Sequence, residues 1–175
     1  ANQLMLSEAH AVANWYFVRE FCYASMFRYN AKGEFNIPYG GIAYNKKNFR
    51  NKIALVFSEP VQQLFEQVQV FNLDFEELLQ NLTLTPNDFI FIDPPYDSEF
   101  SEYDQNAFTL ADQKRLANFL ITCKAKWMVV IKETKFIRKL YTHPSIKINT
   151  FNKNYTYNVR GRNDRKVIHL VITNY

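Results

Sequence analysis

The stretch Phe89-Ile90-Phe91-Ile92-Asp93-Pro94-Pro95-Tyr96 decides the fold class of this 175-residue chain. An unbroken apolar run of Phe and Ile is typical of a parallel strand that is buried on both faces. Two prolines then end the strand, because each fixes its own backbone and lacks an N–H donor. Ligands of open α/β sheets bind beyond the carboxyl ends of the strands. We therefore expect Asp93 to Tyr96 to lie at a ligand site.

The pattern around this stretch predicts an α/β fold with antiparallel strands at its end. Asp74 and Thr109 each stand where a helix N-cap is expected. A hairpin-like loop with basic and aromatic side chains is predicted over 28–41. Helices are predicted at 4–23, 60–67, 75–81, 110–122 and 134–141, and strands at 69–72, 89–92, 127–131, 146–151, 155–159 and 167–173.

Composition excludes several classes of protein. Hydrophobic residues make up 47% of the chain and charged residues 22%, which is ordinary for a globular protein and rules out a disordered or fibrous one. The chain has 4 glycines, with none between Gly41 and Gly161, so no glycine-rich nucleotide loop can be written. Cys22 and Cys123 stand apart in apolar surroundings, and we expect two reduced thiols and no metal site. No apolar run is long enough for a membrane span, and a cytoplasmic protein is expected.

The net charge of +4 conceals a strong segregation along the chain. Residues 1–58 contain 7 Lys and Arg against 3 Asp and Glu, and residues 113–175 contain 14 against 2. Residues 59–112 contain 12 Asp and Glu and no Lys or Arg. Two basic blocks on one face would bind a polyanion such as nucleic acid. The alternative is that the acidic and basic blocks pair with each other.

The Asp-Pro-Pro-Tyr turn also indicates a chemistry. The Asp93 carboxylate and the Pro94 carbonyl are acceptors, and the Tyr96 ring beside them can stack on a planar base. Two acceptors on an exocyclic amine would favour a pyramidal nitrogen, whose lone pair could attack an electrophilic methyl group. The alternative is a turn that merely ends a strand.

Two motifs resemble those of a known family. Asp93-Pro94-Pro95-Tyr96 resembles the catalytic motif of amino-group DNA methyltransferases. The upstream segment Phe27-Arg-Tyr-Asn-Ala-Lys-Gly-Glu-Phe-Asn-Ile-Pro-Tyr-Gly40 resembles the target-recognition hairpin of Dam-type DNA adenine N6-methyltransferases. The resemblance implies the C-terminal part of a Rossmann-like S-adenosylmethionine-dependent sheet, preceded by a helical and hairpin DNA-recognition region. It places recognition in residues 1–58 and catalysis in residues 59–175.

The resemblance also implies a role for each matching residue in the catalytic region. Asp93 and the Pro94 carbonyl would hold the target N6, Pro95 would complete the rigid turn, and Tyr96 would stack on an adenine flipped out of the duplex. Asp74 and Phe75 resemble the family's site for the adenine of S-adenosylmethionine, and Asp93 lies near this cofactor in the family.

In the recognition region, Arg28 matches a position that reads guanine in the major groove, with a surface ion pair as the alternative. Met26 and Pro38 match apolar contacts to base edges, and Tyr23 matches an aromatic wedge. Core packing is the alternative for Met26 and Tyr23. The remaining candidates for contacts with DNA, mainly with phosphate, are polar or basic: Asn30, Lys32, Lys46, Lys47 and Arg50.

The chain departs from the family where the cofactor should bind. The family has an N-terminal cofactor motif and an F-x-G-x-G loop before the hairpin, and neither is found in this sequence. We therefore expect a fragment of a site-specific enzyme acting on double-stranded DNA, from a bacterium or a phage and associated with the nucleoid through DNA. The open alternatives are a non-catalytic DNA-binding remnant, one subunit of a split methyltransferase whose N-terminal segment is a separate chain, or an enzyme acting on cytosine N4 or RNA.

Overall fold

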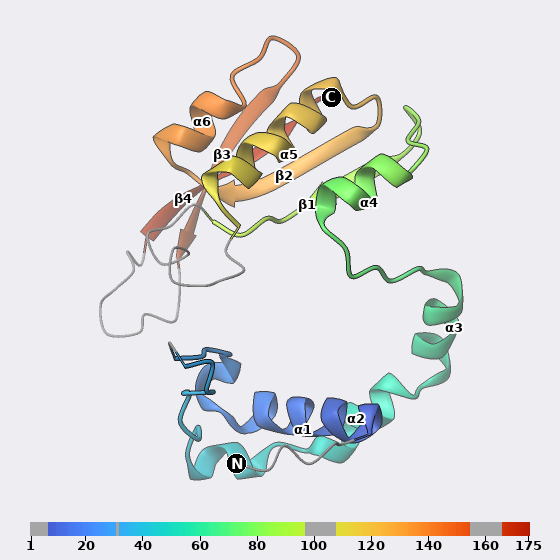
Figure 1. Ribbon diagram of the computed structural model, residues 1–175, viewed down its shortest axis with the longest axis vertical. Helices are drawn as coiled ribbons and strands as arrows, with labels where there is room; N and C mark the ends of the chain where they lie inside the picture. Colours follow the sequence, from blue (N-terminus) through green and yellow to red (C-terminus); the bar gives the residue numbers. More distant parts are fainter. Residues whose placement is uncertain (1–6, 31, 97–107, 155–165) are drawn as a thin grey trace. The chain divides into compact units, whose positions relative to one another are not determined.

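The structure is a computed structural model that describes residues 7–30, 32–96, 108–154 and 166–175 (Figure 1). The chain divides into two compact units, residues 1–70 and residues 71–175. The sequence predicts a boundary between a recognition and a catalytic region at 58/59. The helix Glu59–Gln67, which follows that boundary, lies in the first compact unit of the structure. Among the described residues, no helix is long and apolar enough to cross a membrane.

The first unit is helical, with a hairpin after its first helix. Ser7 caps the first helix, and the hairpin is closed by a bridge between Tyr29 and Phe35. The Phe27 ring packs between Trp15 of the first helix and Phe35, with ring centroids 5.4 Å and 5.3 Å away. The described elements are α1 (Glu8–Phe21), the 3₁₀ turns η1 (Tyr23–Ser25) and η2 (Ile42–Lys46), α2 (Phe49–Val56) and α3 (Glu59–Gln67).

The second unit is an α/β layer built on one four-stranded sheet. The strand order is β1-β2-β4-β3, with β1 parallel to β2 and the other two pairs antiparallel. The predicted mixture of parallel and antiparallel strands is thus confirmed. The elements are α4 (Phe75–Asn81), β1 (Phe89–Ile92), α5 (Leu110–Thr122), β2 (Lys126–Lys132), α6 (Lys135–Leu140), β3 (Lys147–Asn154) and β4 (Lys166–Thr173).

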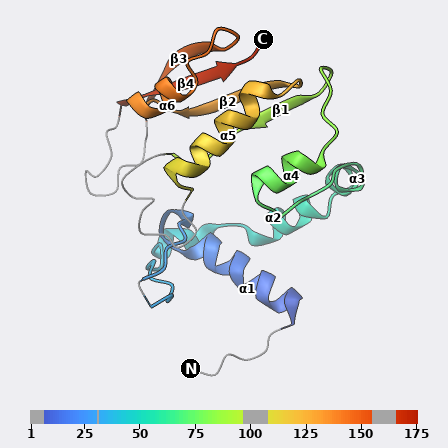
Figure 2. The same ribbon diagram turned by 45° about the horizontal axis from the view of Figure 1, so that its top comes forward.

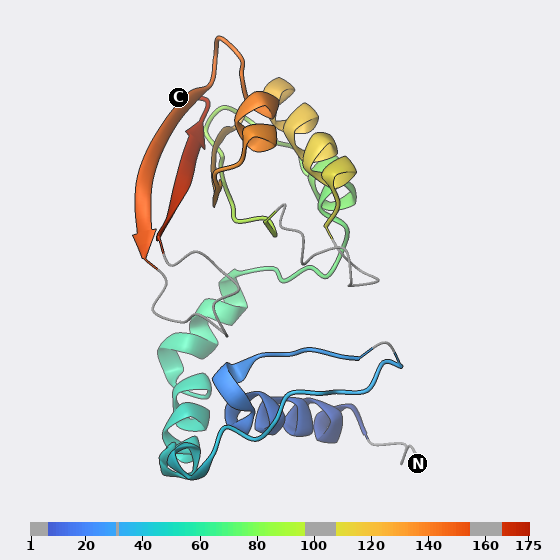
Figure 3. The ribbon, with the colours of Figure 1, turned by 90° about the vertical axis from the view of Figure 1, so that its left-hand side faces the viewer.

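The hydrophobic core lies on the face of the sheet that α5 and α6 cover (Figures 2 and 3). Side chains of a strand alternate between its two faces, so Val129 and Ile131 of β2 and Leu170 and Ile172 of β4 point into this core. Trp127 is fully buried there and donates from Nε1 to the Leu120 carbonyl of α5 at 2.8 Å. This packing fixes α5 against the strands.

The prediction that β1 is buried on both faces is wrong for the described residues. Ile90 and Ile92 pack against the core, whereas Phe89 and Phe91 on the other face are 54% and 61% exposed. β1 is also the edge strand of the described sheet. The apolar run therefore forms a strand in this structure without any described element covering its second face.

Three other predicted strands have different outcomes. Residues 69–72 form no strand, and Val70 is 80% exposed, because no described strand lies alongside to complete a hydrogen-bonded ladder. The predicted strand at 155–159 and most of the basic loop at 160–166 lie outside the described residues. β3 extends to Asn154, beyond its predicted end at 151, because all eight of its residues pair with β4.

Candidate active site and recognition hairpin

The Asp-Pro-Pro-Tyr turn leaves the sheet at the carboxyl end of β1, as the sequence predicts. Asp93 is exposed, Pro94 is buried and Tyr96 is half-buried. An exposed carboxylate at the end of a parallel strand is open to a ligand, and the buried proline anchors the turn below it. The turn thus carries an exposed acceptor, Asp93, and a half-buried aromatic ring, Tyr96, three residues apart in the chain.

Two buried polar side chains hold this turn, and the sequence analysis missed both. Gln113 of α5 is fully buried and donates from Nε2 to the Pro95 carbonyl at 2.8 Å. His169 of β4 is 3% exposed, and its Nε2 lies 3.1 Å from the Tyr96 hydroxyl. Gln113 comes from the helix side of the sheet, and His169 lies on the opposite face. The turn is thus held from both faces.

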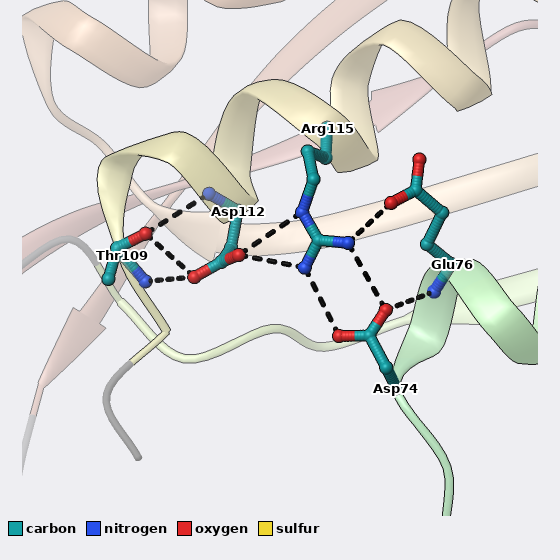
Figure 4. Close-up of polar contacts among 5 residues, drawn as sticks. All are labelled: Asp74, Glu76, Thr109, Asp112 and Arg115. Carbon is teal, nitrogen blue, oxygen red and sulfur yellow. Dashed lines mark hydrogen bonds and ion pairs between the residues drawn. The ribbon is translucent and has the colours of Figure 1, made fainter. Parts of the chain in front are cut away.

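Asp74 caps α4 as predicted, and it also belongs to an ionic network (Figure 4). Its Oδ1 accepts from the Glu76 backbone N–H at 3.0 Å. Arg115 of α5 donates to both oxygens of Asp74 at 3.2 Å and 3.1 Å, to Asp112 at 2.8 Å, and to Glu76. One guanidinium therefore ties the start of α4 to the start of α5.

The start of α5 contributes a capping box to the same network. The Thr109 hydroxyl and backbone N–H both donate to Asp112 Oδ2 at 2.7 Å, and the hydroxyl accepts in return from the Asp112 backbone. These bonds with Thr109, and then those with Arg115, lower the pKa of Asp112 to about 2. The pKa of Asp74 is lowered chiefly by its hydrogen bonds with Arg115. Both carboxylates are therefore ionised near neutral pH.

Phe75 lies directly beside this network. Its ring centroid is 5.4 Å from that of Phe108, and the Arg115 guanidinium carbon lies 4.7 Å from the same ring. Asp74 accepts from Arg115 at both oxygens and from the Glu76 backbone N–H, and a hydrogen bond with the Glu77 backbone also lowers its pKa. A half-buried ring beside an ionised carboxylate fits the adenine end of a nucleoside.

The hairpin presents Arg28 on the surface and fixes its side chain. Arg28 is exposed, and its Nε donates to Asn36 Oδ1 across the hairpin at 2.8 Å. Asn30 forms the turn itself, because its Oδ1 accepts from the backbone N–H groups of Lys32 and Glu34, each at 2.9 Å. Gly33 has a φ of +75°, which a residue with a side chain rarely adopts. Lys32 is exposed at the tip.

The loop that carries Tyr23 has an unusual backbone. Ala24 and Ser25, directly after Tyr23, both have a φ of 54°, in the left-handed region that non-glycine residues seldom occupy. The Tyr44 hydroxyl accepts from the Ala24 backbone N–H at 3.0 Å. A Cβ at Gly40 would meet the Tyr44 ring at 2.6 Å, so a glycine makes room for this support. The structure therefore holds the predicted wedge residue on a constrained turn.

The other predicted DNA contacts lie in different environments. Tyr23 is 38% exposed, Pro38 is exposed, and Met26 is half-buried. Lys46 and Arg50 are exposed.

Lys47, by contrast, is engaged within the first unit. Its ammonium binds the Glu20 carbonyl, lies 3.6 Å from the Glu20 carboxylate and stands 4.3 Å from the centre of the Tyr44 ring. Lys52, which sequence reasoning did not select, also binds Glu20, at 2.5 Å. The hydrogen bond that Glu20 accepts from Lys52 is the main reason that the pKa of Glu20 is lowered.

An α/β unit with a mixed sheet and an Asp-Pro-Pro-Tyr turn at the end of a parallel strand is consistent with a methyltransferase fold. Comparison with known families makes the assignment definite, because residues 2–159 match the family of D12 class N6 adenine-specific DNA methyltransferases. The chain belongs to this family.

Curated relatives agree with this assignment. The chain is 34% identical over 167 residues to the type II methyltransferase M.CviBI of Paramecium bursaria Chlorella virus NC1A, covering 93% of this chain and 60% of that protein. It is 37% identical over 131 residues to the retron Ec67 DNA adenine methylase of Escherichia coli, covering 71% and 43%. A DNA adenine methylase of Vibrio cholerae is 28% identical over 156 residues, covering 84% and 53%. The chain thus spans about half the length of these relatives.

Proposed function

We propose that this chain is the C-terminal part of a DNA adenine N6-methyltransferase that uses S-adenosylmethionine. The observation that carries the proposal is the Asp-Pro-Pro-Tyr turn, held at the end of β1 in a chain of this family. Names of relatives that include DNA adenine methylase and type II methyltransferase support the same reaction.

The residues of the turn suit the chemistry of an exocyclic amine. Asp93 and the Pro94 carbonyl accept hydrogen bonds from the two N6 protons, which draws the nitrogen lone pair out of the aromatic system. Tyr96 stacks on the flipped base and excludes water from one of its faces. When bound, the cofactor supplies an electrophilic methyl group on a cationic sulfonium. The exposed carboxylate of Asp93 favours a cation nearby.

The residues present fit one end of the cofactor. The half-buried Phe75 ring and the ionised Asp74 carboxylate beside it suit its adenine. No glycine lies between Gly41 and Gly161, so this chain offers no glycine-rich cradle in that interval for the methionine end. We infer that residues outside this sequence bind that end.

The open side of the sheet supports the same inference. Phe89 and Phe91 are more than half exposed, and the outer edge of β1 has no partner among the described strands. The segment that carries the remaining cofactor motifs, whether in the same polypeptide or in a separate chain, would pair with β1 and complete the sheet. An open edge of this kind also fits a second candidate for the chain as it stands, one component of a split methyltransferase.

The first unit supports recognition of double-stranded DNA. The hairpin displays Arg28 on the surface, anchored through its Nε to Asn36, and its terminal guanidinium nitrogens suit bidentate contact with guanine. Lys32, Lys46 and Arg50 are exposed and basic, as phosphate contacts require. Tyr23 on its constrained turn is the proposed wedge.

A methylation assay on the intact enzyme tests the proposal. The enzyme is incubated with labelled S-adenosylmethionine and matched oligomers that contain adenine or cytosine in duplex DNA or in RNA. Label on adenine N6 in DNA is expected, and Asp93→Ala, which removes the side-chain acceptor, should abolish it, whereas Glu77→Gln on the exposed side of α4 should not. Label on cytosine N4 or on RNA would contradict the proposed substrate. Full methylation by the Asp93→Ala variant would contradict the proposed site.

Titration of the 175-residue chain with S-adenosylmethionine separates the two candidates. Weak or undetectable binding by the chain alone, restored when the remaining segment is added as a separate polypeptide, is expected for one component of a split enzyme. Tight binding without a partner would contradict that candidate.

A further inference from the structure

His169 contacts the one side chain of the turn that has a flat stacking surface. Its Nε2 lies 3.1 Å from the Tyr96 hydroxyl, and the two ring centroids are 5.5 Å apart at 74°, an edge-to-face arrangement. The two residues are 73 positions apart in the chain. A hydrogen bond and a ring contact therefore join the end of β1 directly to β4.

The position of His169 is set by the sheet itself. β4 lies between β2 and β3, and His169 pairs with Lys132 on one side and with Phe151 on the other. The Phe151 ring packs against the imidazole with a centroid distance of 5.3 Å. His169 therefore lies on an inner strand with a paired strand on each side. Such a residue is well fixed and can hold the side chain of Tyr96, which follows the edge strand β1.

Tyr96 needs such an anchor. The two preceding prolines and Gln113 fix the backbone of the turn, but they do not fix the rotation of the Tyr96 ring about its own side-chain bonds. A bond to the hydroxyl at the far end of the ring restricts that rotation. An apolar residue in place of His169 would fill the space without forming this bond.

We propose that His169 is a positioning residue that holds the Tyr96 ring in the plane on which the target adenine stacks. The proposal rests on the proposed function, in which Tyr96 is the stacking residue. His169 acts through Tyr96 and does not itself touch the substrate.

Burial, together with Lys153 and Lys132, lowers the pKa of His169, and Asp93 opposes this effect. The imidazole is therefore neutral near neutral pH. A neutral ring adds no positive charge beside the site where a cationic cofactor and the Asp93 carboxylate meet.

A double-mutant cycle in the intact enzyme tests the proposal. His169→Leu removes the polar atom and keeps the bulk, and Tyr96→Phe removes only the hydroxyl. Each change should lower kcat about tenfold or more, because small misplacements of reacting groups are costly, while KM for DNA and for S-adenosylmethionine stays nearly unchanged. The double variant should be no slower than either single one, and His169→Gln, whose amide nitrogen can reach the same hydroxyl, should recover much of the rate.

Additive losses in the double variant, or a normal kcat in His169→Leu, would overturn the proposal. A measurement that does not depend on activity keeps the outcome separate from the proposed function. In the 175-residue chain, Tyr96→Phe should shift the ¹⁵N resonance of His169 Nε2, and an unchanged resonance also overturns the proposal. A wild-type enzyme that methylates nothing would instead contradict the proposed function, while the resonance still reports on the contact.

Discussion

Arg28 and Asn36 face each other across the hairpin of the first unit, and the Nε of Arg28 donates to Asn36 Oδ1 at 2.8 Å. This bond uses one of the five guanidinium N–H groups, and the other four belong to the two terminal nitrogens. The bond to Asn36 orders the long Arg28 side chain before DNA binds. Less conformational entropy is therefore lost when the guanidinium contacts a base.

Arg28→Ala should relax specificity at one base pair of the recognition site. A bidentate contact between arginine and guanine discriminates by about 1–3 kcal/mol, so the loss should be confined to one position. Methylation rates on duplexes with every single base-pair change measure this directly. A loss of similar size on all duplexes would show that Arg28 binds phosphate.

Asn36→Ala should weaken the same discrimination less than Arg28→Ala does, because the guanidinium remains but is no longer anchored. The matched control is Asn45→Ala, which removes an exposed amide that accepts from Tyr39 outside this pair. In an Arg28→Ala background, Asn36→Ala should have no further effect on discrimination. An undiminished effect in that background would mean that Asn36 contacts DNA independently.

Gln113→Leu should separate stability from catalysis. The change removes a bond of about 1 kcal/mol to the Pro95 carbonyl, but it also removes a buried Oε1 that has no partner among the described residues, so the free energy of unfolding should change little. Methylation should fall because the turn loses its support from α5. Urea unfolding and initial rates measure the two effects. A large loss of stability with normal activity would contradict this assignment.

Arg115→Leu should lower the midpoint of thermal unfolding more than Arg138→Leu, which breaks an exposed pair with Glu133 alone. Arg115 binds three carboxylates, and its removal would leave Asp74, Glu76 and Asp112 near one another without a cation. Binding of an adenine nucleoside by the intact enzyme should weaken as well, because Asp74 loses its orientation. Equal shifts for the two variants would show that the network adds nothing beyond a surface pair.

His169 predicts a specific dependence of stability on pH. Its pKa is lowered in the folded chain, so between that value and the ordinary value of about 6.5 the unfolded chain binds more protons. The free energy of unfolding should therefore fall as the pH drops below about 6.5. The carboxylates with lowered pKa values, such as Asp112, lose their contribution only at much lower pH. His169→Gln should flatten the curve just below about pH 6.5, and an unchanged slope would contradict the prediction.

Features encoded by neighbouring residues were predictable from the sequence. The caps at Asp74 and Thr109 are found as expected, because a short polar side chain before an apolar-periodic segment acts within one helical turn. The hairpin and the strand ended by two prolines are equally local. The family was identified from the same two segments.

Partners that are distant in sequence were not predictable. Gln113 binds a residue 18 positions away, Arg115 one 41 positions away and His169 one 73 positions away. Periodicity carries a signal for Gln113, which precedes the buried Leu116, Ala117 and Leu120 at helical spacing. The open face of β1 could not be inferred, because an apolar run does not indicate whether a neighbour is present to cover it.

The position of β4 has a consequence for how the protein is made. β4 is the last strand of the described sheet to leave the ribosome, yet it lies between β2 and β3 and contributes Leu170 and Ile172 to the core. Until it emerges, β2 and β3 expose unpaired backbone edges, which invite association with other chains. Asn174 then ties the finished strand to Ala125 and Trp127. We expect premature termination before residue 166 to yield an insoluble product.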